Sequence, residues 1–330
     1  MKNYFKKKYK YLDIPDITNE IFLILLSFLA IIFVKSLLTV SIILLINITL
    51  ILLINKIVIT YESKDDNDKI KFKYLRFLRY YYPVFMIFFC FKEIYVLLFN
   101  LWGTQVFDDL LIEIDRAIFG LDPTVYLSSI NNPYIVEFFQ IIYVLFYFMQ
   151  IIFVTGLYLK HKFNLYKYSM FVIFFGFYLS FIGYLCLPAI GPRFTLHDFK
   201  EKDTELKGVF TYKVIRDAIN LGESIPPDVP NPQDFAQRDA FPSGHTIVAV
   251  LIVYLAFRFK IRFRWVYFVY TLLMIFSTVY LRYHYVIDLI GSIPFILLTI
   301  IVAEYLYRKK LKDYLEESKS SPLISSGVTV

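Results

Sequence analysis

Eight runs of apolar residues, separated by charged segments, constrain this chain more than any other feature. They fall at 20–34, 36–56, 82–101, 134–159, 168–187, 243–258, 263–281 and 285–307. A helix needs about 20 apolar residues to cross the hydrocarbon core of a bilayer, and most of these runs approach that length. The chain is 58% hydrophobic and only 19% charged, which is too little polar surface for a soluble protein of 330 residues. We therefore predict an all-α, polytopic membrane helix bundle with about eight transmembrane helices.

The first two runs leave the number of spans open. Only Lys35 and Ser36 separate them, so they form either a tight hairpin of two spans or one long tilted span. Basic residues help to decide between eight spans and seven, because cytoplasmic loops carry an excess of Lys and Arg. Five segments are rich in these residues: 1–20, 56–79, 160–167, 258–264 and the tail from residue 308. Eight spans place all five segments on one side of the membrane.

The eight-span arrangement puts the N- and C-termini in the cytoplasm. The extracytoplasmic side then receives 102–133, whose only basic residue is Arg116, the long loop 188–242 and the turn at 282–285. The long loop carries seven basic and nine acidic residues, but long loops follow the rule less strictly. Seven spans would leave the lysine-rich N-terminus outside. The same charge distribution accounts for the net charge of +7 without nucleic acid as a partner.

Two of the four histidines stand in an arrangement that suits catalysis. His245 follows Ser243 and Gly244 at the start of one apolar run, and His284 precedes the last run with Asp288 four residues later. His284 and Asp288 share one helical face at that spacing. The 39 residues between the histidines fit two passes of about 20 residues each. One helical hairpin therefore returns His284 to the membrane face at which His245 began.

Both histidines would then lie at helix N-termini. Free backbone N–H groups and the positive end of the helix dipole favour an anion such as phosphate there, and Gly244 would let the backbone approach it closely. An isolated histidine at a span end is more often an interfacial side chain without chemistry. A pair on one face, with a carboxylate near one member, indicates an active site. No cluster of His, Cys, Asp and Glu suggests a metal, and we expect no cofactor.

The string Pro242-Ser243-Gly244-His245, followed by His284 and Asp288, resembles the type 2 phosphatidic acid phosphatase superfamily. Three stretches look more particularly like its inositolphosphotransferase branch, which includes the inositol phosphorylceramide synthases: 115–147, 188–193 and 277–291. The resemblance covers roughly 108–307. It implies a six-helix, phosphatidic acid phosphatase-like core within the bundle.

The resemblance also implies a mechanism. His284 would attack phosphorus and form a phosphohistidine, Asp288 would orient its ring, and His245 would act as general acid and then as general base. The implied phosphate-binding residues are Arg193, Ser243, Gly244 and Arg282.

The chain departs from the wider superfamily at two places. It lacks the superfamily's string of a Lys, six residues and Arg-Pro. It also has Thr278 at the position where the superfamily has an arginine, and the inositolphosphotransferase branch shares this second departure. Both departures remove cations that are expected to bind phosphate. Arg193 and Arg282 are the obvious substitutes.

The acceptor of the phosphoryl group decides the activity. The branch implies transfer of a phospho-head-group from a phospholipid donor to a lipid hydroxyl, such as that of ceramide. With water as acceptor, the same site would be a lipid phosphate phosphatase acting on phosphatidate or an isoprenyl diphosphate. A transporter is a remote alternative, because the intramembrane pair Lys92-Glu93 could mark a translocation path.

We expect three parts in the chain. Residues 1–79 form an N-terminal helical hairpin and a cytoplasmic linker, 80–307 the catalytic membrane domain, and 308–330 a cytoplasmic, disordered tail. Within the middle part, 108–129 is too polar to span and is predicted to form a short amphipathic helix at the interface. The bilayer, its phospholipids and the acceptor are the expected partners.

Overall fold

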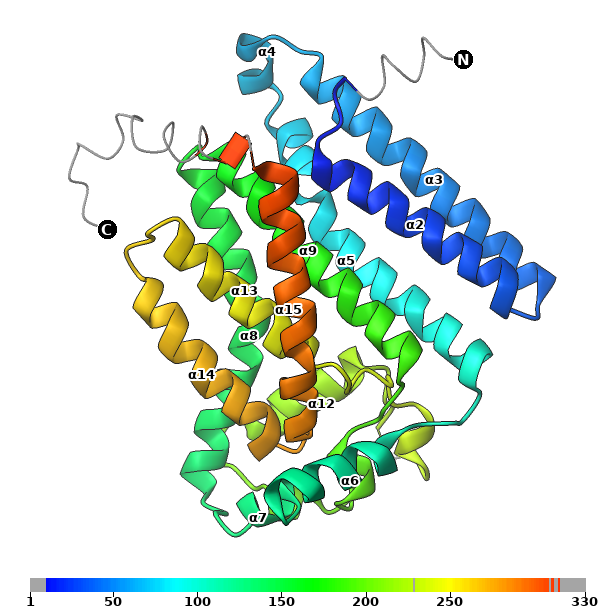
Figure 1. The fold of residues 1–330 in the computed structure, drawn as a ribbon, viewed down its shortest axis with the longest axis vertical. Helices are drawn as coiled ribbons and strands as arrows, with labels where there is room; N and C mark the ends of the chain where they lie inside the picture. Colours follow the sequence, from blue (N-terminus) through cyan, green and yellow to red (C-terminus); the bar gives the residue numbers. More distant parts are fainter. Residues whose placement is uncertain (1–9, 228, 309, 312–313, 315–330) are drawn as a thin grey trace. The chain divides into compact units, whose positions relative to one another are not determined.

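The computed structural model describes residues 10–227, 229–308, 310–311 and 314. Its secondary structure is helical (Figure 1), and within these residues the bridge between Ala189 and Asp239 is an isolated pairing outside any strand. The all-α prediction is confirmed. The chain divides into two compact units after Gly103, because the helix that ends at residue 102 packs with the N-terminal helices. The predicted domain boundary at 79/80 falls inside that helix, and most of the predicted tail lies outside the described residues.

Each of the eight apolar runs forms a helix. They are α2 (Ile14–Phe33), α3 (Leu37–Glu62), α5 (Lys73–Trp102), α8 (Pro133–Leu159), α9 (Phe163–Cys186), α13 (Gly244–Arg258), α14 (Arg264–Tyr280) and α15 (Val286–Tyr307). Six of them are long and apolar enough to cross a membrane. The helices α13 and α14 have only 15 and 17 residues, which is less than the roughly 20 residues of a full span. The chain is therefore a multi-pass membrane protein.

The first two runs form two helices instead of one tilted helix. Ser36 begins α3 as its N-cap, because its hydroxyl accepts a hydrogen bond from the Thr39 amide at 3.3 Å. Both helices pack against each other and against α5. At one end of this unit, the buried Arg79 guanidinium bonds Asp16 at 2.9 Å and Glu62 at 3.0 Å. Since these residues lie at the start of α2 and the end of α3, the two helices form a hairpin.

Hydrogen bonds between polar side chains join the three long helices of this first unit. Asn47 of α3 donates to Glu93 of α5 at 2.8 Å and to Ser27 of α2 at 3.0 Å. The short helix α4 (Asp66–Lys71) connects α3 to α5. Intramembrane charges commonly pair with neighbouring polar groups in this way. The contact gives Glu93 a role in helix packing, and a translocation path is not needed to explain its presence.

The second unit is a bundle of α8, α9, α13, α14 and α15. Figure 1 shows α6 (Asp108–Phe119) and α7 (Pro123–Leu127) lying across the end of this bundle at which α15 begins. The amphipathic segment predicted at 108–129 is thus helical, in two pieces. The loop between α9 and α13 contains four short helices: α10 (Pro192–Thr195), α11 (Lys202–Glu205), α12 (Tyr212–Gly222) and the 3-10 helix η1 (Pro232–Asp234).

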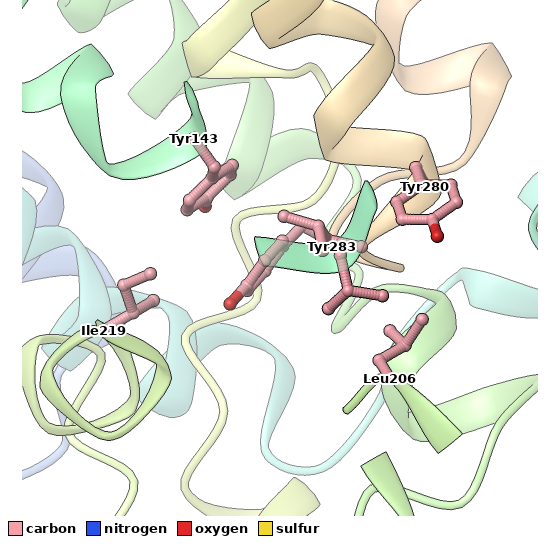
Figure 2. Close-up of a cluster of buried hydrophobic side chains, with 7 residues drawn as sticks. Tyr143, Leu206, Ile219, Tyr280 and Tyr283 are labelled. Atoms are coloured by element: carbon pink, nitrogen blue, oxygen red, sulfur yellow. The ribbon is translucent and has the colours of Figure 1, made fainter. Parts of the chain in front are cut away.

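A buried cluster joins this loop to the bundle. Its members come from α8, from the loop and from the end of α14 with the turn that follows: Val136, Tyr143, Leu206, Ile219, Tyr280, Leu281 and Tyr283. Tyr283 lies among the labelled side chains of Figure 2, and its ring stacks on that of Tyr143 with 4.3 Å between centroids. Stacked aromatic rings of this kind contribute beyond their buried area. The loop is therefore folded onto the end of the bundle.

A carboxylate fixes the same loop to α8. Glu137 accepts hydrogen bonds from the amides of Val209 at 2.9 Å and Thr211 at 2.6 Å, just before α12 begins. A side chain at Gly208 would meet this carboxylate, because a Cβ there would lie 2.5 Å from Oε2 of Glu137. Charge-assisted bonds to backbone amides are stronger than neutral ones. Glu137 therefore holds the start of α12 in place.

Candidate active site

His284 lies in the turn between α14 and α15, one residue before Tyr285, the N-cap of α15. Its Nδ1 is 3.2 Å from Oδ2 of Asp288, and the same oxygen accepts the Tyr285 amide at 2.8 Å. The Thr278 carbonyl accepts the His284 amide at 3.1 Å, which fixes the backbone of the turn. The spacing of four residues thus brings the Asp288 carboxylate to the imidazole.

A backbone carbonyl determines where the proton sits on this imidazole. The Ala240 oxygen lies 2.9 Å from Nδ1 of His284. Because a carbonyl can only accept, Nδ1 must carry the proton, and Nε2 presents its lone pair. The Ala240 amide in turn donates to the Ala189 carbonyl at 3.0 Å, which holds this segment beside the turn before α10. Sequence reasoning missed this contact, because a backbone acceptor carries no signal in residue type.

His245 is the second residue of α13, and its Nδ1 lies 3.4 Å from Nε2 of His284. The hairpin of α13 and α14 therefore brings the two histidines together. The His245 ring packs against Tyr143 and Phe146 of α8, with 4.9 and 4.6 Å between ring centroids. Since Nε2 of His284 carries no proton, Nδ1 of His245 is the donor between them. Nε2 of His245 is buried and has no hydrogen-bond partner among the described residues.

Arg193, in α10, lies beside the histidines. Its guanidinium pairs with Glu223 and lies over the Tyr283 ring, 4.9 Å from the centroid. It is 4% exposed, and within the described part of the chain its Nε and Nη1 have no hydrogen-bond partner. Burial lowers the pKa of His284 well below its usual value, and His245 and Arg193 lower that pKa further. The His284 ring is therefore neutral at physiological pH.

The turn that carries Arg193 is held from α6. The Asp108 carboxylate accepts the Gly191 amide at 2.8 Å and the Tyr285 hydroxyl at 2.9 Å. Gly191 has φ of 90°, and a Cβ there would lie 2.7 Å from a backbone oxygen in the turn before α15. Only glycine suits both conditions. Asp108 thus links the Arg193 turn to the start of the helix that follows His284.

Asp115, also in α6, occupies the N-terminus of α15. Its carboxylate accepts the amides of Val286 at 2.9 Å and Ile287 at 2.7 Å. From the sequence, this helix start was expected to favour a phosphate; in the structure its free amides bond an internal carboxylate. The physical reason is the same, because unpaired N–H groups and the helix dipole attract any anion.

Ser243 and Gly244 begin α13 in close contact with their surroundings. The Ser243 amide donates to the Asp288 carbonyl at 3.1 Å, and its hydroxyl accepts the Thr246 amide at 3.2 Å. A Cβ on Gly244 would lie 2.4 Å from the Tyr184 hydroxyl. The Ser243 amide, which the sequence suggested for phosphate binding, is therefore engaged within the protein. Ser243 serves as the N-cap of the helix that carries His245.

Arg282 and Arg193 differ in their surroundings, although both were predicted to bind phosphate. Arg282 pairs with Glu205 of α11 and donates to the Ser128 hydroxyl after α7 at 3.0 Å. These contacts direct the Arg282 guanidinium toward the short helices α7 and α11. Arg193 instead acts electrostatically on His284 and has two unused donors, Nε and Nη1, whereas Arg282 has one, Nε.

The assembled groups match the needs of phosphoryl transfer. They comprise an oriented imidazole whose Nε2 is unprotonated, a second imidazole that donates a hydrogen bond to this Nε2, and a guanidinium with unused donors. In the part of the chain that the structure describes, no group of three or more His, Cys, Asp or Glu side chains could hold a metal ion.

Comparison with known proteins identifies a family for this chain. The family model of the PAP2 superfamily matches residues 110–302, a range that includes Arg193, both histidines and Asp288. No curated protein and no solved structure matches the chain. The superfamily comprises phosphatases and phosphotransferases, which supports an enzyme. Since the match covers more than half of the chain, this protein belongs to the PAP2 superfamily.

Proposed function

We propose that this protein is a membrane-embedded lipid phosphotransferase of the inositolphosphotransferase type. It would move a phospho-head-group, such as phosphoinositol, from a phospholipid to a lipid hydroxyl, such as that of ceramide. The observation that carries the proposal is the state of His284. Its Nε2 bears a lone pair because Nδ1 donates to Ala240 and Asp288, and Arg193 lies nearby to neutralise a phosphoryl group.

The reaction follows in two halves. In the first, Nε2 of His284 attacks phosphorus, the bond from phosphorus to the lipid oxygen breaks, and protonated His245 gives its proton to that oxygen. Asp288 stabilises the positive charge that develops on the phosphorylated ring. In the second half, His245 takes the proton of the acceptor hydroxyl, whose oxygen attacks phosphorus and releases His284. The free Nε and Nη1 of Arg193 would bond the phosphoryl oxygens in both halves.

Burial of the site favours a lipid hydroxyl over water as acceptor. His284 is 4% exposed, and the loop from α9 to α13 is folded onto the bundle end that carries it. Exclusion of water suppresses hydrolysis of a reactive intermediate. The same residues would perform hydrolysis if water reached the phosphohistidine, and the superfamily includes phosphatases. Hydrolysis of phosphatidate or of an isoprenyl diphosphate is therefore the alternative reaction.

We also propose that both termini are cytoplasmic and that the active site faces the extracytoplasmic side. The five basic segments support this orientation, because they fall on one side when the eight apolar helices alternate in direction. The histidines lie at the opposite ends of these helices.

The test is a product analysis. Purified protein in detergent is incubated with phosphatidylinositol labelled in its head group, with and without ceramide, and separately with labelled phosphatidate. A labelled ceramide product supports transfer. Inorganic phosphate from phosphatidate as the sole product would identify a phosphatase, and free inositol phosphate as the sole product would identify a hydrolase that uses water as acceptor. Absence of any product from either lipid would refute the proposal.

The roles of the histidines are tested on the same reaction. His284→Ala should abolish turnover and the acid-labile label that a labelled donor leaves on the protein. His245→Ala should keep some activity on substrates with a good leaving group, which departs without a proton. Asp288→Asn should fall between the two variants. Survival of the label in His284→Ala and its loss in His245→Ala would reverse the assignment.

A further inference from the structure

The loop between α9 and α13 contains a buried lysine that the proposed reaction does not use. Lys202 begins α11, is 2% exposed, and lies with its Nζ 4.2 Å from the centroid of the Tyr283 ring. Within the described residues, Nζ has no hydrogen-bond partner, and no ion pair is formed with a carboxylate. Burial of an ammonium group without a partner is costly, so such a position needs an explanation.

Lys202 and Arg193 border the same ring. The guanidinium of Arg193 lies 4.9 Å from the centroid of Tyr283, the residue immediately before His284. Two donors of Arg193 and Nζ of Lys202 are buried and unused. Tyr283 is central in the cluster drawn in Figure 2, at the junction of α8, the loop and the turn before α15. Two cations with unused donors therefore meet at one ring beside the nucleophile.

The neighbouring arginines of this loop region are compensated, in contrast to Lys202. Arg216 bonds Asp203 at 2.5 Å and the Leu206 carbonyl at 2.8 Å, and Arg282 pairs with Glu205. The carboxylates close to these arginines are thus already engaged. The Lys202 amine remains without a carboxylate partner among the described residues.

We propose that Lys202, together with Arg193, forms a second anion subsite that binds a second phosphate group on the head group of the substrate. The proposal rests on the proposed function, since the first phosphate is the one that His284 attacks. Arg193 would bridge both phosphates, because it lies near His284 and shares the Tyr283 ring with Lys202. Lysine is a common phosphate ligand in proteins and acts as a point charge.

The second phosphate could have either of two sources. In a lipid diphosphate it would be the neighbour of the reacting phosphorus. In a phosphatidylinositol that carries a ring phosphate, it would belong to the head group itself. Both present the same chemistry to Lys202, and the substrate assay below separates them.

The charge state of Lys202 supplies a further readout. Burial lowers the pKa of Lys202 well below its usual value, and Arg216 and Arg193 lower that pKa further. The other charged groups that act on it are Glu223, which raises the pKa, and Arg282, which lowers it. An arriving anion favours the protonated amine, so binding takes up a proton. Anion affinity should therefore fall as pH rises.

The first experiment measures binding of inorganic pyrophosphate and inorganic phosphate to the full-length protein in detergent by calorimetry. Wild type should bind pyrophosphate about tenfold or more tightly than phosphate. Lys202→Met should lose most of that preference, whereas Lys207→Met, a matched change at an exposed lysine of the same loop, should keep it. Equal pyrophosphate affinity in wild type and Lys202→Met would overturn the proposal.

A charge-preserving variant provides a second test in case Lys202→Met does not fold. Lys202→Arg keeps its charge at every accessible pH, so its pyrophosphate affinity should fall less steeply with pH than that of wild type. Comparison of the two proteins cancels the titration of pyrophosphate itself. Identical pH profiles would show that Lys202 does not contact the anion.

The substrate assay compares kcat/KM for a lipid monophosphate, a lipid diphosphate and a phosphatidylinositol with a ring phosphate. Wild type should favour at least one of the two doubly phosphorylated lipids, and Lys202→Met should lose that preference. The lipid whose advantage disappears identifies the source of the second phosphate. If no lipid is turned over, the proposed function fails, and the pyrophosphate measurement still decides the subsite. If both preferences survive in Lys202→Met, the subsite is refuted.

Discussion

Replacing Asp115 with alanine should disturb the active site without touching a histidine. The carboxylate accepts the amides of Val286 at 2.9 Å and Ile287 at 2.7 Å, at the start of the helix that follows His284. A hydrogen bond to a charged group contributes about 1.5–3 kcal/mol, and loss of an N-cap costs about 0.5–2 kcal/mol. Asp115 is 2% exposed, so water replaces the carboxylate poorly. We expect the free energy of unfolding to fall by about 2–4 kcal/mol.

The same substitution should also lower activity, because His284 is close in sequence to the amides that Asp115 binds. His284 stands two residues before the first released amide, so its ring should lose its fixed position, and kcat should fall about 10- to 100-fold. Thermal unfolding in detergent and turnover of the preferred lipid measure the two effects. Asp115→Asn retains one acceptor oxygen and should be intermediate, and Glu113→Ala removes an exposed carboxylate from the same helix as a control. If Asp115→Ala matches Glu113→Ala in both assays, the carboxylate does not support the site.

Three further predictions concern charge, pH and orientation. Arg193→Lys should reduce turnover about 100-fold, because a bidentate fork becomes a point charge; near-normal turnover in both Arg193→Lys and Arg193→Ala would show that other groups hold the phosphate. The lowered pKa of His284 keeps its nucleophilic form present at neutral pH, so kcat/KM should not drop through loss of this form near pH 6.5, where an ordinary histidine titrates, but only at clearly lower pH. Folding stability should decline as the pH falls below about 6.5, because the unfolded state then binds more protons than the folded state. A rate profile that follows a nucleophile with an ordinary or raised pKa would contradict this. A cysteine at Lys200 should react with an impermeant reagent from outside and one at Lys260 only from the cytoplasmic side; labelling of both from one side would refute the topology.

The helices were predictable because each depends on local sequence. An apolar run of sufficient length has no alternative to a helix in a bilayer, since every backbone group must find a partner within the segment. The break between α2 and α3 was ambiguous for a local reason too: Val34 to Ser36 supply neither glycine nor proline to end a helix. The structure ends α2 there and caps α3 with Ser36, and the Arg79 network at the far end keeps the pair together. Such a network joins three distant segments and leaves no periodic signal.

The candidate site likewise has some contacts that the sequence predicts and others that it does not. The approach of Asp288 to His284 follows from a spacing of four residues, and the approach of His245 follows from the length of one hairpin. Both are properties of helices that sequence spacing encodes directly. The Ala240 carbonyl depends on how the loop before α13 returns to the turn before α15, which no residue type reveals. The burial of Lys202 is hidden for the same reason, because a lysine in a polar loop reads as exposed.

Three carboxylates explain how a site made largely of loops can be rigid. Asp108 and Asp115 of α6 and Glu137 of α8 each bond backbone amides of a segment next to a site residue: the turn before Arg193, the start of α15 and the start of α12. Loop amides at a membrane face cannot satisfy one another as helix amides do, and a buried unpaired N–H is costly. A charged acceptor satisfies several amides at once and fixes their direction. Acidic residues in such segments are read from sequence as topology signals, yet here they act as anchors. The position of His284 therefore depends on helices that carry none of the proposed catalytic residues.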